Sequence, residues 1–104
     1  MIGTPGYTAP EIMTGQNYSF SADMWSLGSL MYALLSARLP FFSDDRKELK
    51  RRACTEPLDL DSNRRLKNLS LPAKDLLNGL LRKSPNERLT IEQALSHEWF
   101  QQWS

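Results

Sequence analysis

Apolar residues recur along this chain at the three- and four-residue intervals of α-helices, and no segment alternates clearly enough to predict a strand. The most apolar helix is expected to begin near Ser21, its expected N-cap, with Asp23 in the first turn, and to continue through Leu35. Apolar residues fall on nearly every face of this helix, which is typical of a helix buried on all sides. Either this domain encloses the helix, or another part of the protein covers it.

Local start and stop signals predict two more helices in the first half of the chain. A short helix over residues 9–14 would have Pro10 in its first turn and end at Gly15. Ser43 is the expected N-cap of a helix over residues 44–53, with acids in its first turn and bases in its last, as the helix dipole favours.

The second half of the chain opens with a polar, irregular connection over residues 54–69. Ser70 then caps a helix expected over residues 71–83, which Pro85 ends. Thr90 and Gln93 have the spacing of a capping box, so a fifth helix should follow and lead to Trp99 and Phe100. The expected fold class is therefore all-α, with about five helices.

Composition limits the classes of function that fit. The chain has 104 residues, enough for one domain or part of one, and its net charge of +1 provides no general attraction to nucleic acid or to an anionic membrane. Its longest apolar stretch, residues 24–37, is too short to span a bilayer, and we see no signal peptide. A single cysteine (Cys54) and a single histidine (His97) make neither a disulfide nor a zinc site. We expect a cytoplasmic protein, with the nucleus also possible, and no nucleic-acid or membrane partner.

Three separated motifs then suggest a family. Residues 3–11 read Gly-Thr-Pro-Gly-Tyr-Thr-Ala-Pro-Glu; residues 23–28 read Asp-Met-Trp-Ser-Leu-Gly, followed by Leu-Pro-Phe-Phe at 39–42. Residues 83–90 read Lys-Ser-Pro-Asn-Glu-Arg-Leu-Thr, and 94–100 continue to His-Glu-Trp-Phe. In this order and at this spacing, the motifs resemble the C-terminal lobe of eukaryotic protein kinases, most closely the calcium/calmodulin-dependent group of Ser/Thr kinases. The resemblance covers nearly the whole chain.

The resemblance implies that residues 1–104 are a partial kinase domain, from the end of the activation segment to the last helix of the lobe. A complete parent would use ATP and Mg²⁺ to phosphorylate Ser or Thr of a protein substrate. This sequence has no Gly-x-Gly-x-x-Gly loop, Val-Ala-Ile-Lys strand, His-Arg-Asp loop or Asp-Phe-Gly motif. We therefore expect that the chain alone holds no catalytic residue, cofactor or metal, is inactive, and has the missing N-terminal lobe as its partner.

The resemblance also assigns roles to individual residues. In the family, the glutamate of the Ala-Pro-Glu triplet, here Ala9, Pro10 and Glu11, pairs with an arginine that corresponds to Arg88. Such a pair is chemically suitable, because a guanidinium presents a planar fork to a carboxylate. Without the motifs, Glu11 and Arg88 would be read as ordinary surface charges.

The loop before this triplet would receive the protein substrate. The resemblance implies that Thr4 bonds the catalytic aspartate and lysine of the parent and that Gly3, Pro5 and Tyr7 shape the same pocket. The alternative for Thr4 is a turn hydroxyl before proline.

Three residues of the central helix also belong to the motifs. Asp23 either supports the helix dipole or, as the resemblance implies, anchors the absent catalytic loop by accepting backbone N–H bonds. Trp25 and Gly28 are assigned to packing, Trp25 against the core of the lobe and Gly28 at a close approach between helices.

Other residues depart from the family or are ambiguous. Ala37 stands where a glycine usually ends the central helix, at a cost of about 1 kcal/mol if that position needs a positive φ. The basic run over residues 46–52 is either a solvated helix face or a docking face for a partner. His97 is expected to be a packed or capping residue rather than a proton shuttle.

Two alternatives to a kinase part remain at this point. One is a non-catalytic, kinase-like interaction or decoy module that keeps the substrate-docking surface. The other is an unrelated helical bundle whose motifs match by chance, which the order of the three motifs disfavours.

Overall fold

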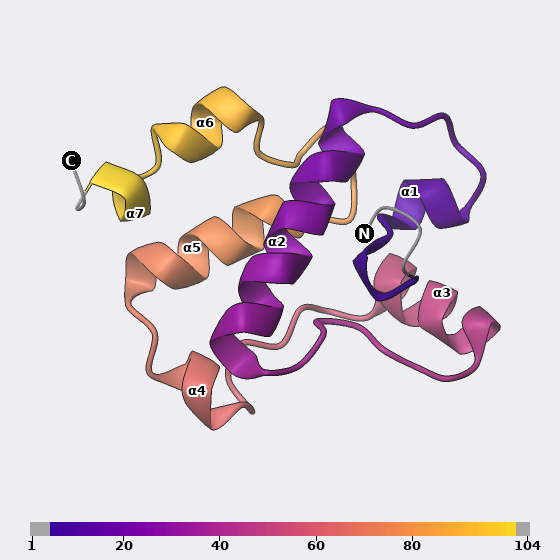
Figure 1. Cartoon of the computed structure of the whole chain (residues 1–104), viewed down its shortest axis with the longest axis horizontal. Helices are drawn as coiled ribbons and strands as arrows, with labels where there is room; N and C mark the ends of the chain where they lie inside the picture. The colour runs from indigo at the N-terminus through magenta and orange to yellow at the C-terminus, as the bar shows by residue number, and fades with distance from the viewer. Residues whose placement is uncertain (1–4, 102–104) are drawn as a thin grey trace.

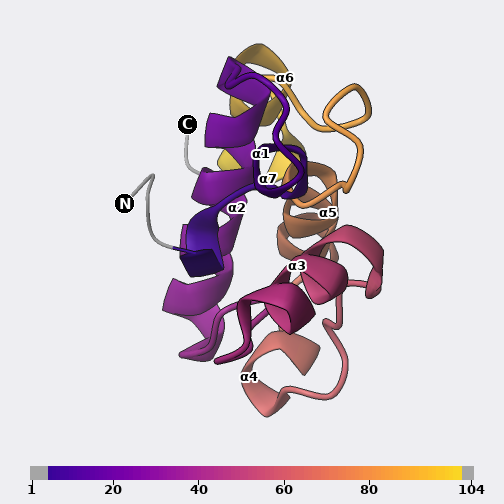
Figure 2. The same cartoon turned by 90° about the vertical axis from the view of Figure 1, so that its right-hand side faces the viewer.

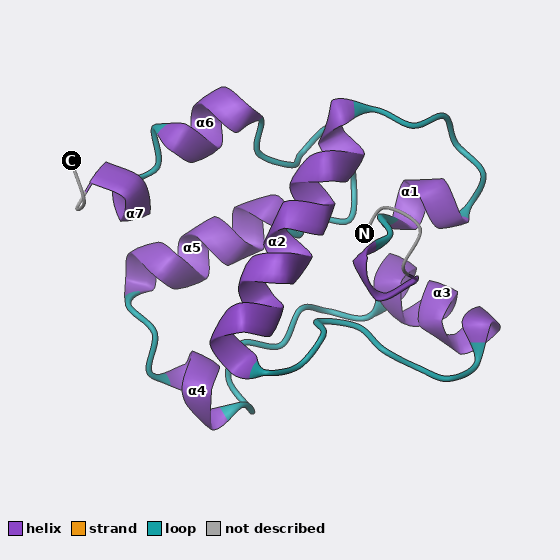
Figure 3. Ribbon diagram, viewed as in Figure 1, coloured by secondary structure: helices purple, strands orange, loops and turns teal. Residues whose placement is uncertain are grey.

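Helix α2 (Phe20–Ser36) crosses the middle of the molecule, and the other helices are arranged around part of its length (Figure 1). The computed structural model describes residues 5–101, and every regular element in that range is a helix (Figure 3). In the side view α2 runs through most of the height of the molecule (Figure 2). The other elements are the 3-10 turn η1 (Pro5–Tyr7) and the helices α1 (Pro10–Met13), α3 (Arg46–Thr55), α4 (Arg64–Lys67), α5 (Leu71–Leu80), α6 (Ile91–Leu95) and α7 (Glu98–Gln101). The all-α prediction is confirmed.

Several of the predicted helix signals work as their chemistry suggests. Pro10 occupies the first turn of α1, and Gly15 follows that helix with a φ of 91°. The Ser70 hydroxyl accepts the backbone N–H of Ala73 and caps α5. Thr90 and Gln93 form both hydrogen bonds of the capping box that opens α6.

Two predicted N-caps are wrong. Helix α2 begins at Phe20, so its N-cap is Ser19, two residues before the expected Ser21. Helix α3 begins at Arg46 because the Asp45 side chain, not Ser43, accepts the backbone N–H of Lys47. In both cases neighbouring polar residues could each cap the helix, and the local sequence does not distinguish them.

The second half contains more, and shorter, helices than predicted. Helix α4 lies in the segment expected to be irregular, where Asn63 caps it and Leu66 anchors it in the core. Helix α5 ends at Leu80 rather than near residue 83. The predicted fifth helix is two helices, because His97 starts a new one by accepting the backbone N–H of Trp99 at its Nδ1 atom, 3.0 Å away. His97 is thus a capping residue, as expected.

The core lies where α2 meets α5. Gly28 of α2 faces Leu80 and Leu81 so closely that a Cβ atom on Gly28 would lie 2.8 Å from the Cβ atom of Leu80. The packing role expected for Gly28 therefore follows from the close approach of the two helices. Trp25, one turn before Gly28, is 2% exposed and belongs to the larger of the two core clusters, together with Leu77.

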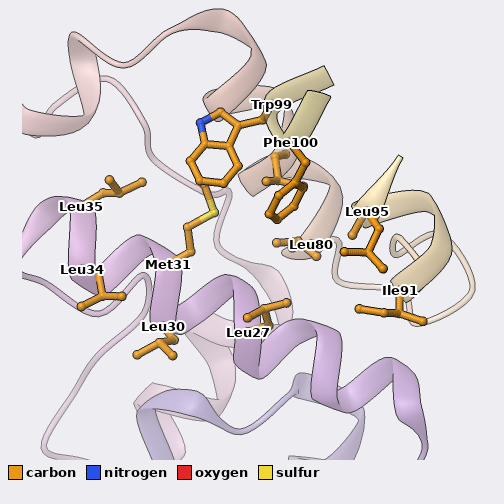
Figure 4. A pocket seen from close by; sticks show the side chains of 12 residues that line it. Leu27, Leu30, Met31, Leu34, Leu35, Leu80, Ile91, Leu95, Trp99 and Phe100 are labelled. Atoms are coloured by element: carbon orange, nitrogen blue, oxygen red, sulfur yellow. The ribbon is translucent and has the colours of Figure 1, made fainter. Parts of the chain in front are cut away.

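Helix α2 is not enclosed on all sides by the described residues. Leu27 and Leu34 are 42% and 78% exposed, although both lie in the middle of an apolar sequence. They line an apolar groove of about 310 Å³ whose other walls come from α5, α6 and α7, with Trp99 and Phe100 at one end (Figure 4). The first of the two expectations for this helix, complete enclosure by this domain, is therefore wrong for residues 5–101.

The end of α2 is strained. Ala37, its C-cap, has φ 64° and ψ 22°, and it is the one residue other than glycine with a positive φ in the described range. A side chain with a Cβ atom disfavours this left-handed conformation, whereas glycine adopts it freely. The departure noted in the sequence therefore has the expected structural consequence.

We expect Ala37→Gly to raise the free energy of unfolding by about 1 kcal/mol, because it removes this strain. Urea denaturation followed by circular dichroism measures the effect. Ala33→Gly is the matched control: Ala33 lies inside α2, so the same substitution there should destabilise by about 0.5–1 kcal/mol. Equal effects of the two substitutions would contradict the strain at Ala37.

Candidate functional site

The segment before α2 carries the first motif, and its local geometry brings a carboxylate inward. The turn η1 leads to Ala9, which is the N-cap of α1 and accepts backbone N–H groups of Ile12 and Met13. Pro10 then occupies a position where no N–H is needed, and Glu11 follows it in the first turn. Glu11 is buried, and its side chain points away from solvent toward Arg88 of the third motif.

Glu11 and Arg88 form a two-pronged ion pair across 77 positions of sequence. The Nη1 atom of Arg88 lies 2.8 Å from Oε2 of Glu11, and Nη2 lies 3.0 Å from Oε1. The Arg88 and Glu11 side chains are 0% and 4% exposed. The contact that the resemblance implies is therefore present, and the surface-charge alternative is wrong.

Every N–H of the Arg88 guanidinium has an acceptor. Besides Glu11, Nη1 donates to the backbone oxygen of Ser21 at 2.9 Å, and Nη2 donates to that of Lys83 at 3.2 Å. Nε donates to the backbone oxygen of Arg82 at 2.9 Å. A guanidinium has five N–H groups, so this set satisfies all of them and removes the main cost of burying the charge.

An aromatic and cationic stack lies against the ion pair. The guanidinium carbon of Arg88 is 5.2 Å from the centre of the Trp25 ring, and that ring stacks on Phe41 with 5.9 Å between centroids. The Lys83 ammonium lies 3.7 Å from the centre of the Phe41 ring. It also donates to the backbone oxygen of Ala53, near the C-terminus of α3, at 2.8 Å. One cluster thus connects all three motifs and also holds α3.

Burial changes the proton affinity of Lys83. Desolvation of its ammonium lowers the pKa from 10.5 to about 8, while the nearby Cys54 and Glu56 act in the opposite direction. The contacts with the Phe41 and Trp25 rings also favour the charged form. Lys83 is the first residue of the third motif, and nothing in the sequence indicates that its ammonium turns inward.

The remaining motif residues are placed as follows. Ser26 donates to the backbone oxygen of Tyr7 at 2.8 Å and so fixes η1 against α2. Asp23 lies in the first turn of α2, where it accepts a hydrogen bond from the Tyr18 hydroxyl. Gly3 and Thr4 lie outside the described residues, and the substrate-binding roles of Gly3, Thr4, Pro5 and Tyr7 stay predictions.

Two serines contribute in ways that the sequence did not indicate. The hydroxyl of Ser21 donates to the backbone oxygen of Pro85 at 2.9 Å, and its backbone oxygen receives Arg88. Ser21 was expected to be the N-cap of α2, and its contacts with Pro85 and Arg88 were not predicted. Ser26 looked like an ordinary polar position of a helix, and no local signal identifies its contact with η1.

Glu11, Arg88 and Lys83 form a structural cluster, which we call the joint, that holds distant parts of the chain together. Arg88 donates to Glu11 and to the backbone oxygen of Lys83, and the Lys83 ammonium donates to the backbone oxygen of Ala53. Among residues 5–101 no three His, Cys, Asp or Glu side chains gather where they could hold a metal ion. Nor does the described range contain a helix both long and apolar enough to cross a bilayer.

Comparisons with known proteins agree on one family. Residues 1–100 match the model of the protein kinase domain. A probable myosin light chain kinase of Dictyostelium discoideum is 42% identical over 99 residues, which is 95% of this chain and 20% of that kinase. The serine/threonine-protein kinase PLK4 of Drosophila virilis is 37% identical over 97 residues, 93% of this chain and 12% of that kinase. Calcium-dependent protein kinase 25 of Arabidopsis thaliana is 38% identical over 99 residues, 95% of this chain and 19% of that kinase. The chain thus spans a fifth or less of the length of these relatives.

We expect Glu11→Gln to lower the free energy of unfolding by about 3–5 kcal/mol, because it leaves the Arg88 guanidinium buried without its counter-charge. Chemical denaturation monitored by tryptophan fluorescence measures this. Glu48→Gln is the matched control, because Glu48 pairs with Arg51 on the solvent-exposed side of α3 and should change stability little. Similar losses in the two variants would contradict the special status of the buried pair.

We expect Lys83 to titrate near pH 8 in the folded protein, more than two units below an ordinary lysine. Between pH 8 and 10.5 the unfolded state then binds more protons than the folded state, so stability should rise with pH in this window. NMR titration of ¹³C-dimethylated lysines locates the pKa, with Lys83→Gln assigning the signal. The same variant should lose this part of the pH dependence of unfolding, and an unchanged profile would contradict the assignment.

Proposed function

The chain belongs to the protein kinase domain family, and we propose that it is the helical C-terminal lobe of a Ser/Thr protein kinase, beginning at the end of the activation segment. The complete enzyme would transfer the γ-phosphate of ATP to Ser or Thr of a protein substrate. This chain would provide the substrate-receiving loop and the scaffold beneath it. ATP and Mg²⁺ would be bound by other parts of the enzyme.

The single observation that carries the proposal is the buried ion pair of Glu11 and Arg88. In the family that the chain belongs to, this pair ties the end of the activation segment to the helical lobe. Here it has two-pronged geometry, full burial and an acceptor for every guanidinium N–H. Because this geometry requires several residues to be placed together, it supports a kinase lobe rather than a chance match of motifs.

The pair also supports the role of the preceding loop. Glu11 ties α1 to Arg88, and Ser26 of α2 fixes the backbone at Tyr7, so the chain is held on both sides of Thr8. We propose that this attachment presents Gly3, Thr4, Pro5 and Tyr7 to the protein substrate, with Thr4 bonding the catalytic aspartate and lysine of the complete enzyme. A rigid support of this kind is what substrate positioning requires.

The exposed groove of α2 supports a missing partner. Leu27 and Leu34 are apolar, exposed and at the wall of the groove, and a lobe that functioned alone would expose them to water. We propose that the rest of the kinase domain covers this face. The alternative is a non-catalytic interaction or decoy module that keeps the substrate-docking surface.

A chimera tests the proposal. This chain replaces the matching 99 residues of the Dictyostelium kinase, and phosphorylation of a Ser/Thr peptide is measured. We expect an active chimera, whereas the 104-residue chain alone should show no saturable ATP binding in calorimetry. Thr4→Val in the chimera should lower kcat/KM at least about tenfold, the loss of one hydrogen bond in the transition state.

Thr55→Val is the matched control in the same chimera. Thr55 is exposed at the end of α3, and its hydroxyl bonds only the backbone oxygen of Arg51. This variant should leave the rate unchanged. A folded chimera without activity, beside an active parent, would contradict the kinase proposal and favour the decoy module.

A further inference from the structure

Positive charge is unevenly distributed along this chain. Residues 62–74 contain four of the 13 bases and no acid, whereas the other 91 residues carry nine bases and all 12 acids. The four bases are Arg64, Arg65, Lys67 and Lys74, which we call the α4 corner. This segment therefore carries a local charge of +4 and, unlike the basic run over residues 46–52, contains no acid, although the net charge of the chain is only +1.

The fold displays these bases at one end of the molecule. Leu66 of α4 is fully buried and Asn63 caps the helix, so the single turn is fixed while its neighbours face outward. Arg64, Arg65 and Lys67 are all exposed. In both Figure 1 and Figure 2, α4 is the lowest helix and lies at the edge of the structure.

None of the α4 corner side chains forms an ion pair with another described residue. The Lys74 ammonium donates to the backbone oxygen of Lys67 at 2.9 Å, which draws it toward α4. By contrast, the bases of α3 are partly neutralised: Arg51 and Arg52 pair with Glu48 and Glu56. The field of the α4 corner is therefore not cancelled by internal partners.

A hollow with both apolar and polar walls adjoins the corner. Leu71, in the first turn of α5, is 80% exposed, and it lines a hollow of about 460 Å³ together with Leu58, Leu60 and Lys74. Asp61 and Asp75 also line the hollow, so it repels the acidic side chains of a ligand and suits an apolar one. Acidic groups are attracted to the α4 bases instead.

We propose that the α4 corner and this hollow dock a protein segment that carries several Asp or Glu residues beside an apolar residue. The charges complement the bases, and the apolar side chain enters beside Leu71. Nucleic acid fits less well, because no Phe, Tyr or Trp on which a base could stack is among the described residues that line this hollow. This inference is independent of the kinase proposal, since it uses none of the residues of the joint at Glu11 and Arg88.

The test uses the 104-residue chain and a fluorescein-labelled peptide with the repeat Glu-Glu-Leu, followed by fluorescence polarisation. We expect saturable binding that weakens as salt is raised. The triple variant Arg64→Gln, Arg65→Gln, Lys67→Gln should weaken binding about tenfold or more, and Leu71→Ser should weaken it at unchanged charge.

The control variant removes three bases from α3: Arg46→Gln, Lys47→Gln, Lys50→Gln. These residues are not in ion pairs among the described residues, and α3 lies on the opposite side of the molecule from α4 in Figure 1. We expect binding to be nearly unchanged in this control. Circular dichroism of each variant verifies that the fold is kept, as surface substitutions should allow.

Three outcomes would overturn the proposal. Equal weakening by the α3 and α4 variants would reveal general charge attraction. No saturation by the peptide at millimolar concentration would exclude an acidic protein segment as the ligand. Tighter binding to phosphatidylserine vesicles or to a single-stranded oligonucleotide than to the peptide, lost in the α4 variant, would assign the corner to a membrane or to nucleic acid.

Discussion

The buried ion pair of Glu11 and Arg88 joins segments 77 positions apart and so constrains which parts of the chain can meet. It joins a helix at the beginning of the chain to a loop near its end, and the backbone oxygens of Ser21, Arg82 and Lys83 complete its shell. A buried pair of this kind is not necessarily more stable than apolar residues of the same volume. Its stronger effect is on specificity, since any alternative packing that separates the two charges leaves one of them buried and unpaired.

The stack of Trp25, Phe41 and Lys83 extends this constraint to α3. Trp25 contacts both the guanidinium of Arg88 and the ring of Phe41, and Lys83 reaches from the loop of Arg88 to the end of α3. Lys83 bears its charge at the carbonyl end of a helix, where a cation is favoured, but in surroundings that desolvate it. Helices α1, α2 and α3 and the loop before α6 are thus positioned by one small set of polar and aromatic contacts.

Two parts of the surface differ from this joint because their side chains lack partners within the described residues. The groove of α2 exposes leucines that an isolated domain would bury, and α4 displays bases that no acid neutralises. Apolar and charged surfaces of this kind suit different occupants: the groove suits an apolar face, and the α4 corner suits an acidic segment. Both surfaces arise because buried residues of the same helices, Trp25 in α2 and Leu66 in α4, turn their neighbours outward.

Three features could be predicted from the sequence: the helical class, the caps at Ser70 and Thr90, and, through the family motifs, the pairing of Glu11 with Arg88. These features follow from residue type and short spacing, or from motifs that specify a known contact. Local sequence did not decide between Ser19 and Ser21 as a cap, and it did not indicate α4, whose four residues give no periodic pattern. The contacts of Ser21 and Lys83 with Arg88 and the exposure of Leu34 could not be predicted, because they depend on which helices pack against α2. Burial and partners are set by segments distant in sequence, so the composition of a single helix does not reveal them.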